Sequence, residues 1–252
     1  MSAIVAHDIS VIRGGRIALG PSSFEIPENK ITALIGPNGS GKSTLLHALA
    51  HLLPLASGEL SILNQTPDLA KTNISYVFQH QGISQQAPMT VLRMVEIGRW
   101  ARKRPWQKLN AEDRFVVREA LQRLNILDLA DRQVTQLSGG QLQRVLVAQG
   151  VAATHSILVL DEPLTGLDVT SAKIIDDLIH EEPARGCTVI LTTHDLDEAR
   201  AADHVLLLAG SVIASGSPKD VLTQENLETA YRLRTLHQNG DEPFSFETEH
   251  HH

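Results

Sequence analysis

A glycine-rich segment of nine residues carries the clearest chemical signal in the chain. It reads Gly36-Pro37-Asn38-Gly39-Ser40-Gly41-Lys42-Ser43-Thr44. Glycines let the backbone turn closely around a phosphate chain, and the N–H groups at the start of the following helix face the anion. Lys42 adds a positive charge, and the Ser43 hydroxyl is a ligand for Mg²⁺. Because the segment lies between the apolar run 31–35 and a helical pattern at 45–50, it predicts a nucleotide-binding site rather than a chance turn.

Two acidic residues follow a second apolar run. Asp161 and Glu162 come directly after 156–160, which predicts a buried strand, and ligands of parallel α/β sheets bind at the carboxyl ends of the strands. Asp161 would hold Mg²⁺ through water, and Glu162 would orient or deprotonate the water that attacks the γ-phosphate. An isolated acidic pair would be interpreted as exposed loop residues. The phosphate-binding segment upstream favours the catalytic interpretation.

Two further segments carry groups that suit a phosphate. The residues Leu137-Ser138-Gly139-Gly140-Gln141 precede a helical pattern over 142–148, and the start of a helix presents backbone N–H donors to an anion. A lone glycine pair of this kind is a weak signal. His194 ends the apolar run 189–193, where it would hydrogen-bond the γ-phosphate and hold the attacking water, although a lone histidine is more often structural.

Composition limits the classes of protein to which the chain can belong. Its 252 residues suffice for one large core or a core with an inserted subdomain, and the net charge of −7 argues against nucleic acid as a partner. The single cysteine, Cys187, lies in an apolar run, which predicts a buried core residue and no disulfide. We find no signal peptide and no apolar stretch long enough to span a bilayer, so a membrane role would require a partner.

Two short segments have competing interpretations. The stretch 99–108 is cationic and holds two tryptophans, which would suit nucleic acid or a membrane surface. We favour a solvated loop whose tryptophans pack on a helical subdomain, given the acidic chain as a whole. His250, His251 and His252 would suit a metal ion, but a purification tag is the better interpretation of this terminal run.

Hydrophobic periodicity places these residues on strands and helices. Antiparallel strands are predicted at 9–12 and 23–26 with a turn at 13–16, and further strands at 31–35, 59–63, 73–78, 156–160, 189–193, 204–208 and 212–214. Helices are predicted at 45–50, 91–97, about 110–124, 142–148 and 223–234, with Thr90 and the pair Asn110 and Asp113 as N-terminal caps and Ser217 beginning another. The fold class is α/β, with a parallel-sheet core, an N-terminal antiparallel β-subdomain and an inserted α-helical subdomain.

The order of these motifs resembles that of the ATP-binding subunits of ABC transporters over nearly the whole chain. The motifs are a phosphate loop at 36–44, a Q-loop glutamine at Gln79, the signature at 137–141, the strand with its acids at 157–163, a D-loop at 164–168 and a switch histidine at His194. The resemblance implies one ATPase domain over 1–240. It has a P-loop (RecA-like) core at 1–82 and 137–240, a helical subdomain at about 83–136, and a tail at 241–252.

The resemblance also implies how the site works. Two chains would pair head to tail as a homodimer, with ATP between the phosphate loop of one and Ser138, Gly139, Gly140 and Gln141 of the other. Ser43, Gln79 and Asp161 would hold Mg²⁺, and Glu162, His194 and Gln79 would be catalytic. The family often has an aromatic residue that stacks on adenine near the start of the chain, but Ile12 and Arg13 stand there. Either Arg13 would stack through its guanidinium plane, or Ile12 would make a weaker apolar contact.

The cargo is also implied by resemblance only. The stretches 87–100, 129–133 and 225–231 look most like those of manganese and zinc importers. This implies ATP-driven uptake through two transmembrane permease subunits and an extracytoplasmic substrate-binding protein, with this chain at the cytoplasmic face of the membrane. Importers of iron-siderophore, haem or cobalamin are the alternative. The single cassette and helical insertion of ordinary length disfavour a non-transport ABC ATPase, and the signature and His194 disfavour a small-molecule P-loop kinase.

Overall fold

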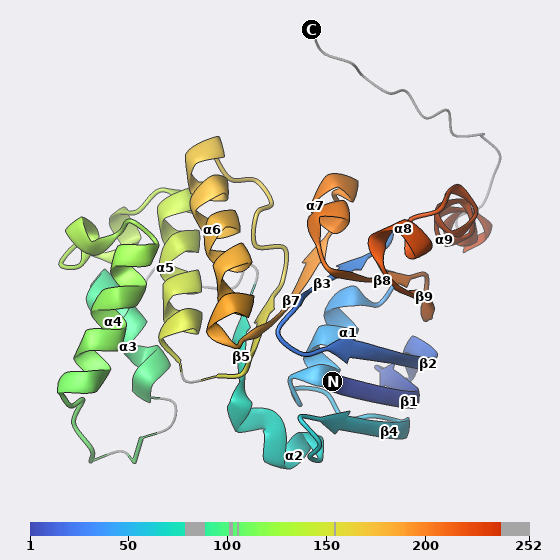
Figure 1. The fold of residues 1–252 in the computed structure, drawn as a ribbon, viewed down its shortest axis with the longest axis horizontal. Coiled ribbons are helices and arrows are strands. Elements are labelled where there is room, and N and C mark those ends of the chain that lie inside the picture. Colours follow the sequence, from blue (N-terminus) through green and yellow to red (C-terminus); the bar gives the residue numbers. More distant parts are fainter. Residues whose placement is uncertain (79–88, 101–102, 105, 154, 238–252) are drawn as a thin grey trace, which may run out of the picture.

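A six-stranded sheet forms the centre of the molecule (Figure 1). Its strands, in spatial order, are β5 (Ile74–Val77), β6 (Ile157–Leu160), β7 (Thr188–Thr193), β3 (Ile31–Ile35), β8 (His204–Leu208) and β9 (Val212–Gly216). Neighbours are parallel except for β8 and β9, which form the predicted antiparallel hairpin. Every residue of β3, β6 and β7 is buried. This is expected of uninterrupted apolar runs covered on both faces.

The computed structural model describes residues 1–78, 89–100, 103–104, 106–153 and 155–237. Gln79, the predicted boundary near residue 83, the tail at 241–252 and the terminal histidines lie outside the described residues.

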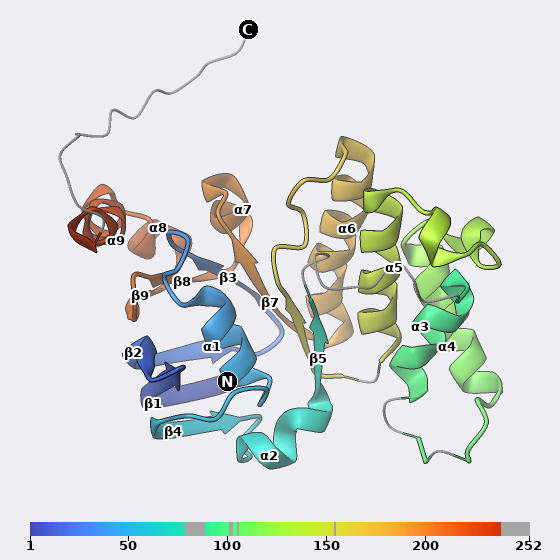
Figure 2. The same cartoon turned by 180° about the vertical axis from the view of Figure 1, so that it is seen from behind.

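A second, antiparallel sheet has the order β2-β1-β4 and consists of β1 (Ser2–Arg13), β2 (Arg16–Pro27) and β4 (Ser57–Ile62). The three predicted strands are confirmed, and the first two are longer than predicted because inward and outward residues continue to alternate along them. Helix α1 (Lys42–Leu49) lies against this sheet (Figure 2). Its buried Leu45 and Leu46 share one hydrophobic cluster with Ile4 of β1 and Ile157 of β6, so the helix fills the space between the two sheets.

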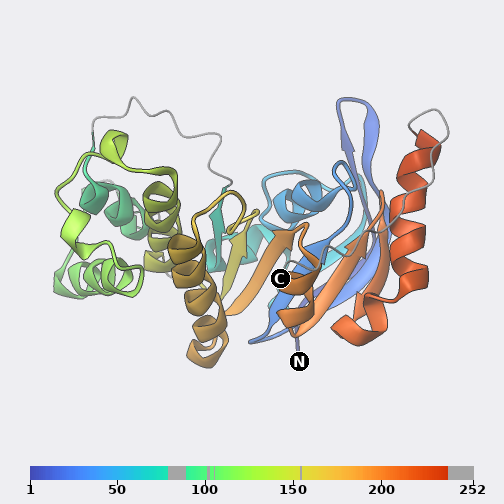
Figure 3. The same cartoon turned by 90° about the horizontal axis from the view of Figure 1, so that it is seen from above.

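The opposite face of the large sheet is covered by α5 (Gly139–Ala152) and α6 (Val169–Glu181), with α3 (Val91–Trp100) and α4 (Ala111–Arg123) packed beyond them (Figure 3). Successive residues of β6 face opposite layers. Leu158 packs in the hydrophobic cluster of these helices, whereas Ile157 packs in the cluster that contains α1. The predicted helices at 91–97 and 110–124 are confirmed. Asn110 and Asp113 form the predicted reciprocal cap, each accepting from the other's backbone N–H.

The remaining elements are short or lie toward the carboxyl end. They are α2 (Pro67–Ala70), α7 (Leu196–Ala201), α8 (Pro218–Val221), α9 (Gln224–His237) and the 3₁₀ turns η1 (Lys71–Asn73), η3 (Leu127–Leu129), η4 (Val134–Gln136) and η5 (Glu182–Arg185). Ser217 caps α8 as predicted, whereas α6 was not predicted although Asp168 caps it and its Ile175 and Leu178 are buried at helical spacing. No helix within the described ranges is long and apolar enough to cross a lipid bilayer.

Candidate nucleotide-binding site

The phosphate loop joins the carboxyl end of β3 to the start of α1. At its entrance the backbone passes so close to β8 that a Cβ on Gly36 would lie 2.1 Å from the Leu208 carbonyl oxygen, so only glycine fits. The loop is further tied to the β8–β9 turn, where Gly210 N–H donates to the Ser40 carbonyl at 3.0 Å. The loop is therefore anchored on one side by the sheet and on the other by the helix it begins.

Lys42 turns back into this loop. Its Nζ donates to the carbonyl oxygens of Gly36 at 2.7 Å and Pro37 at 3.2 Å, and the residue is buried. Burial lowers the pKa of Lys42, while the nearby carboxylates of Glu162 and Asp161 oppose that shift. A phosphate in the loop would supply a stronger anionic partner in place of two neutral carbonyl groups.

Asp161 is the centre of a hydrogen-bond network at the end of β6. Thr192 Oγ1 donates to its Oδ1 at 2.6 Å, Ser43 Oγ donates to the same oxygen at 3.4 Å, and Tyr76 OH donates to Oδ2 at 3.2 Å. Ser43 and Asp161 are 118 residues apart in sequence and are brought together as predicted. The carboxylate and hydroxyl oxygens are the donors that Mg²⁺ prefers, so this set fits that ion.

Tyr76 and Thr192 are site residues that the sequence analysis did not identify. Tyr76 lies on β5 next to β6, and Thr192 lies on β7 on the other side of β6, so strand order alone places both beside Asp161. Burial, followed by the Asp161 carboxylate, raises the pKa of Tyr76, which keeps its hydroxyl a proton donor. The only available signal was a polar residue near the carboxyl end of each apolar run.

Glu162 has an unusual backbone conformation. Its φ is 48°, in the left-handed region that non-glycine residues rarely adopt, and its N–H donates to Thr192 Oγ1 at 2.8 Å. Thr192 Oγ1 therefore accepts from Glu162 while donating to Asp161. Strain of this kind costs about 1–3 kcal/mol and persists only where the surroundings impose it, which is common at functional sites. One hydroxyl thus fixes both acidic residues.

His194 follows the last residue of β7 and is exposed. Leu160 of β6 pairs with Leu191 of β7, so His194 and the two acidic residues leave neighbouring strands at the same edge of the sheet. Two local contacts hold the turn between β7 and α7. Asp195 caps α7, and Thr193 Oγ1 donates to Glu198 at 2.6 Å. The structure therefore places His194 near the predicted site with its side chain open to solvent.

The signature segment 137–141 lies at the start of α5, in the layer on the opposite side of the sheet from α1. Ser138 Oγ accepts from Gln141 N–H at 3.3 Å, and Gln141 Oε1 accepts from Ser138 N–H at 3.0 Å, a reciprocal cap. Gly140 packs so tightly that a Cβ would lie 2.5 Å from Ser171 Oγ of α6. Within one chain the signature thus contacts α6, whereas the phosphate loop contacts Asp161.

Arg13 ends β1 at the tip of a hairpin and is exposed. Ile12 pairs with Ile17 on β2, and both are unusually exposed for isoleucine, at 54% and 71%. The region where an adenine contact was predicted therefore offers a cationic side chain beside a small apolar surface.

Comparison with known proteins agrees with this geometry. The sequence profile described as "ABC transporter" matches residues 19–165. The manganese transport system ATP-binding protein MntB of Bacillus subtilis strain 168 is 35% identical, over 92% of this chain and 93% of the relative. The zinc transport system ATP-binding protein TroB of Treponema pallidum strain Nichols is 34% identical, over 91% of this chain and 86% of the relative.

A solved structure shares the fold. The ATP-binding cassette MJ0796, described as a dimer in a post-hydrolysis state bound to ADP and Pi, superposes with a TM-score of 0.75 at 27% identity, over 85% of this chain and 98% of that one. The phosphate loop, the acidic residues at the end of β6 and the capped signature helix are all present in one α/β fold. The chain therefore belongs to the ABC transporter family and is an ATP-binding cassette ATPase of that family.

Proposed function

We propose that this chain drives the uptake of manganese or zinc by hydrolysing ATP. The observation that carries the proposal is the contact of the phosphate loop, through Ser43, with Asp161, which shares the Thr192 hydroxyl with Glu162. The relatives of the chain are named for manganese and zinc transport. The ATPase domain spans 1–240, with the core at 1–82 and 137–240 and the helical subdomain at about 83–136.

Each site residue has a distinct role in the proposed mechanism. Lys42 and the backbone of 36–44 bind the phosphates, and Ser43 and Asp161, with Gln79, would hold Mg²⁺. When bound, that ion supplies charge neutralisation on the β- and γ-phosphates. Glu162 accepts a proton from the attacking water and orients it, and His194 hydrogen-bonds the γ-phosphate. Thr192 is a positioning residue for both carboxylates.

The active unit is proposed to be a head-to-tail homodimer. In one chain the signature packs on α6 and its Ser138 and Gly139 are exposed, which leaves them available to the ATP held by a second chain. The cassette MJ0796 is a dimer in its solved structure with ADP and Pi. N–H donors from the signature would then stabilise the γ-phosphate from the side opposite Lys42. ATP binding would thereby close the dimer.

Mixed dimers test this arrangement. Ser138→Arg should block the site formed with the partner, and Lys42→Ala should disable the chain's own phosphate loop. A mixture of the two single variants should regain a large part of one site's activity, because one composite site in the mixed dimer contains neither substitution. Failure of the mixture to exceed the two separate variants would refute head-to-tail pairing.

Adenine is proposed to lie against the hairpin tip. The guanidinium plane of Arg13 would stack on the base, and the exposed Ile12 and Ile17 would supply apolar contact. Stacking on this surface would be weaker than stacking on an aromatic ring, so GTP would compete with ATP for the site. Two transmembrane permease subunits and an extracytoplasmic binding protein would complete the transporter, with this chain at the cytoplasmic face of the membrane. No nucleic acid is proposed as a partner.

Elemental analysis of cells tests the cargo. Manganese, zinc and iron would be measured together in limiting medium, in cells with the gene, cells without it, and cells that carry Lys42→Ala. A selective loss of manganese or zinc in the second and third strains is expected. Unchanged manganese and zinc with a fall in iron would overturn the proposed cargo in favour of an iron-siderophore or haem importer, while leaving the ATPase mechanism intact.

A further inference from the structure

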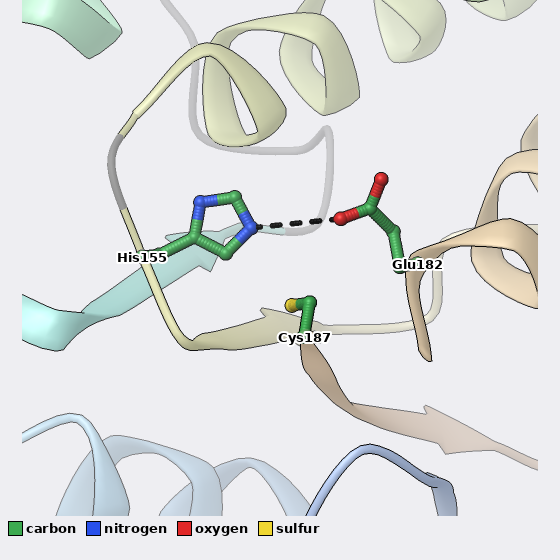
Figure 4. A group of neighbouring side chains, drawn as sticks. All are labelled: His155, Glu182 and Cys187. Atoms are coloured by element: carbon green, nitrogen blue, oxygen red, sulfur yellow. Dashed lines mark ion pairs between the residues drawn. The ribbon is translucent and has the colours of Figure 1, made fainter. Parts of the chain in front are cut away.

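A second cluster of reactive side chains lies away from the nucleotide site (Figure 4). His155 precedes β6, Glu182 begins η5, and Cys187 immediately precedes β7. The three side chains converge from separate segments, and the side chains of His155 and Glu182 are only 6% and 5% exposed. They line a cavity of about 250 Å³ between these segments and helices α4 and α5.

The donor atoms have the composition and spacing of a metal site. An imidazole nitrogen, a thiol sulfur and a carboxylate oxygen all lie within 4.8 Å of one another, and His155 Nε2 lies 3.9 Å from Glu182 Oε2. Around a tetrahedral Zn²⁺, ligand atoms are separated by about 3.3–3.7 Å, so each pair would have to close by at most about 1.5 Å to complete the geometry. Nitrogen, sulfur and oxygen donors together favour a borderline-soft divalent cation over Mn²⁺, Mg²⁺ or Ca²⁺.

The orientation of His155 suits metal binding. Its Nδ1 lies 2.6 Å from the Ala153 carbonyl oxygen, so Nδ1 carries the hydrogen and, in the neutral ring, Nε2 carries the lone pair. Nε2 is the nitrogen that faces Glu182. A backbone carbonyl that fixes the tautomer in this way is the usual support of a metal-bound histidine.

The cationic side chains that line the cavity have carboxylate partners. Arg123 of α4 lies 2.6 Å from Glu182 Oε1 and 3.2 Å from Glu181, and Arg185 lies 2.7 Å from Glu119. Arg99, the third arginine that lines the cavity, lies 2.9 Å from Asp113, so all three arginines are paired with carboxylates. Glu182 uses Oε1 for Arg123 and directs Oε2 toward the histidine, and its carboxylate also hydrogen-bonds with the Cys187 thiol, so all three proposed ligands already contact one another.

We propose that His155, Glu182 and Cys187 form a binding site for Zn²⁺ or a similar borderline-soft divalent cation, with water as the fourth ligand. Burial, followed by the Glu182 carboxylate, raises the pKa of Cys187 to about 12, so the thiol is protonated without metal. Formation of the sulfur–metal bond releases that proton to solvent. The competing interpretation is a buried ion pair between protonated His155 and Glu182. The site concerns this chain alone and does not depend on the proposed cargo.

Cobalt spectroscopy of the full chain tests the site. Cys187 is the only cysteine, so a thiolate-to-Co²⁺ charge-transfer band reports this site and cannot arise from the terminal histidines. The wild-type protein titrated with Co²⁺ should develop the band, equimolar Zn²⁺ should abolish it, and equimolar Mn²⁺ should leave it. Cys187→Ser should abolish the band, and His155→Gln should weaken Co²⁺ binding at least tenfold.

A matched control is available on the neighbouring residue. Glu181 contacts the same Arg123 but lies outside the cluster, so Glu181→Gln should leave the band and the Co²⁺ affinity unchanged. Circular dichroism would establish that each variant is folded. Absence of the band in folded wild-type protein at millimolar Co²⁺, or an unchanged affinity in folded His155→Gln, would overturn the proposal. The cobalt titration measures neither ATP hydrolysis nor transport. A negative result would therefore leave the proposed function untouched.

Discussion

Replacement of Thr192 by valine tests the positioning network most directly. Thr192 is fully buried, and valine has nearly the same shape, so the substitution removes the hydroxyl without creating a cavity. Two hydrogen bonds are lost together: the one donated to Asp161 at 2.6 Å and the one accepted from Glu162 N–H at 2.8 Å. Ser43 and Tyr76 still contact Asp161, so that carboxylate keeps two of its partners.

The magnitude follows from the charge of Asp161 and the strain at Glu162. A hydrogen bond to a charged group contributes about 1.5–3 kcal/mol. Without its acceptor, Glu162 can also relax from φ 48°, which releases about 1–3 kcal/mol of strain and moves its carboxylate. Since about 1.4 kcal/mol corresponds to a tenfold rate, we expect kcat to fall about 10- to 100-fold. The affinity for ATP should change less than about threefold because the Lys42 cradle is unaltered.

The assay compares steady-state ATP hydrolysis with nucleotide affinity and thermal unfolding. The matched control is Thr188→Val, on the same strand. Thr188 is also buried, and its hydroxyl accepts from Asn29 N–H at 2.9 Å at the end of the strand remote from the nucleotide site. Thr188→Val should lose about 1 kcal/mol of stability, the usual contribution of one neutral hydrogen bond. A kcat within twofold of wild type for Thr192→Val, or an equal loss in Thr188→Val, would show that the hydroxyl does not position the acidic pair.

Three further predictions follow from individual contacts. Tyr76→Phe removes the donor to Asp161 Oδ2, so the Mg²⁺ concentration for half-maximal ATP hydrolysis should shift several-fold while the unfolding temperature changes little; an unchanged Mg²⁺ dependence would count against the network. Thr32→Val should raise the unfolding temperature, because Thr32 Oγ1 is buried without a hydrogen-bond partner among the described residues; a lower temperature would contradict this interpretation. Burial alone would raise the pKa of Asp113, but hydrogen bonds from Lys103, the Asn110 backbone and Arg99 lower it to about 2. Because the folded pKa lies below the ordinary value of 3.8, this carboxylate stabilises the protein above about pH 4, and that stability is lost as the pH falls toward 2; acid unfolding of Asp113→Asn should lack this component.

The local chemistry of the chain could be predicted from its sequence alone. The glycine-rich loop, the apolar runs that became β3, β6 and β7, and the reciprocal cap of Asn110 and Asp113 depend on residues within a few positions of one another. Backbone geometry fixes which neighbours can meet over such short distances, so spacing is sufficient evidence. The order of the motifs along the chain likewise indicates the ATPase family.

Only the tertiary structure decided which distant residues meet. Thr192 and Tyr76 reach Asp161 because β7 and β5 flank β6, and periodicity does not encode the order of strands in a sheet. The left-handed backbone of Glu162 goes with the hydrogen bond from its N–H to Thr192 on the neighbouring strand. His155, Glu182 and Cys187 also converge from three separate segments. The sequence by itself thus determined the helices and strands and the chemistry of their side chains. The tertiary structure decided which of those side chains meet, because burial of the apolar faces of the helices and strands against one sheet selects the long-range contacts.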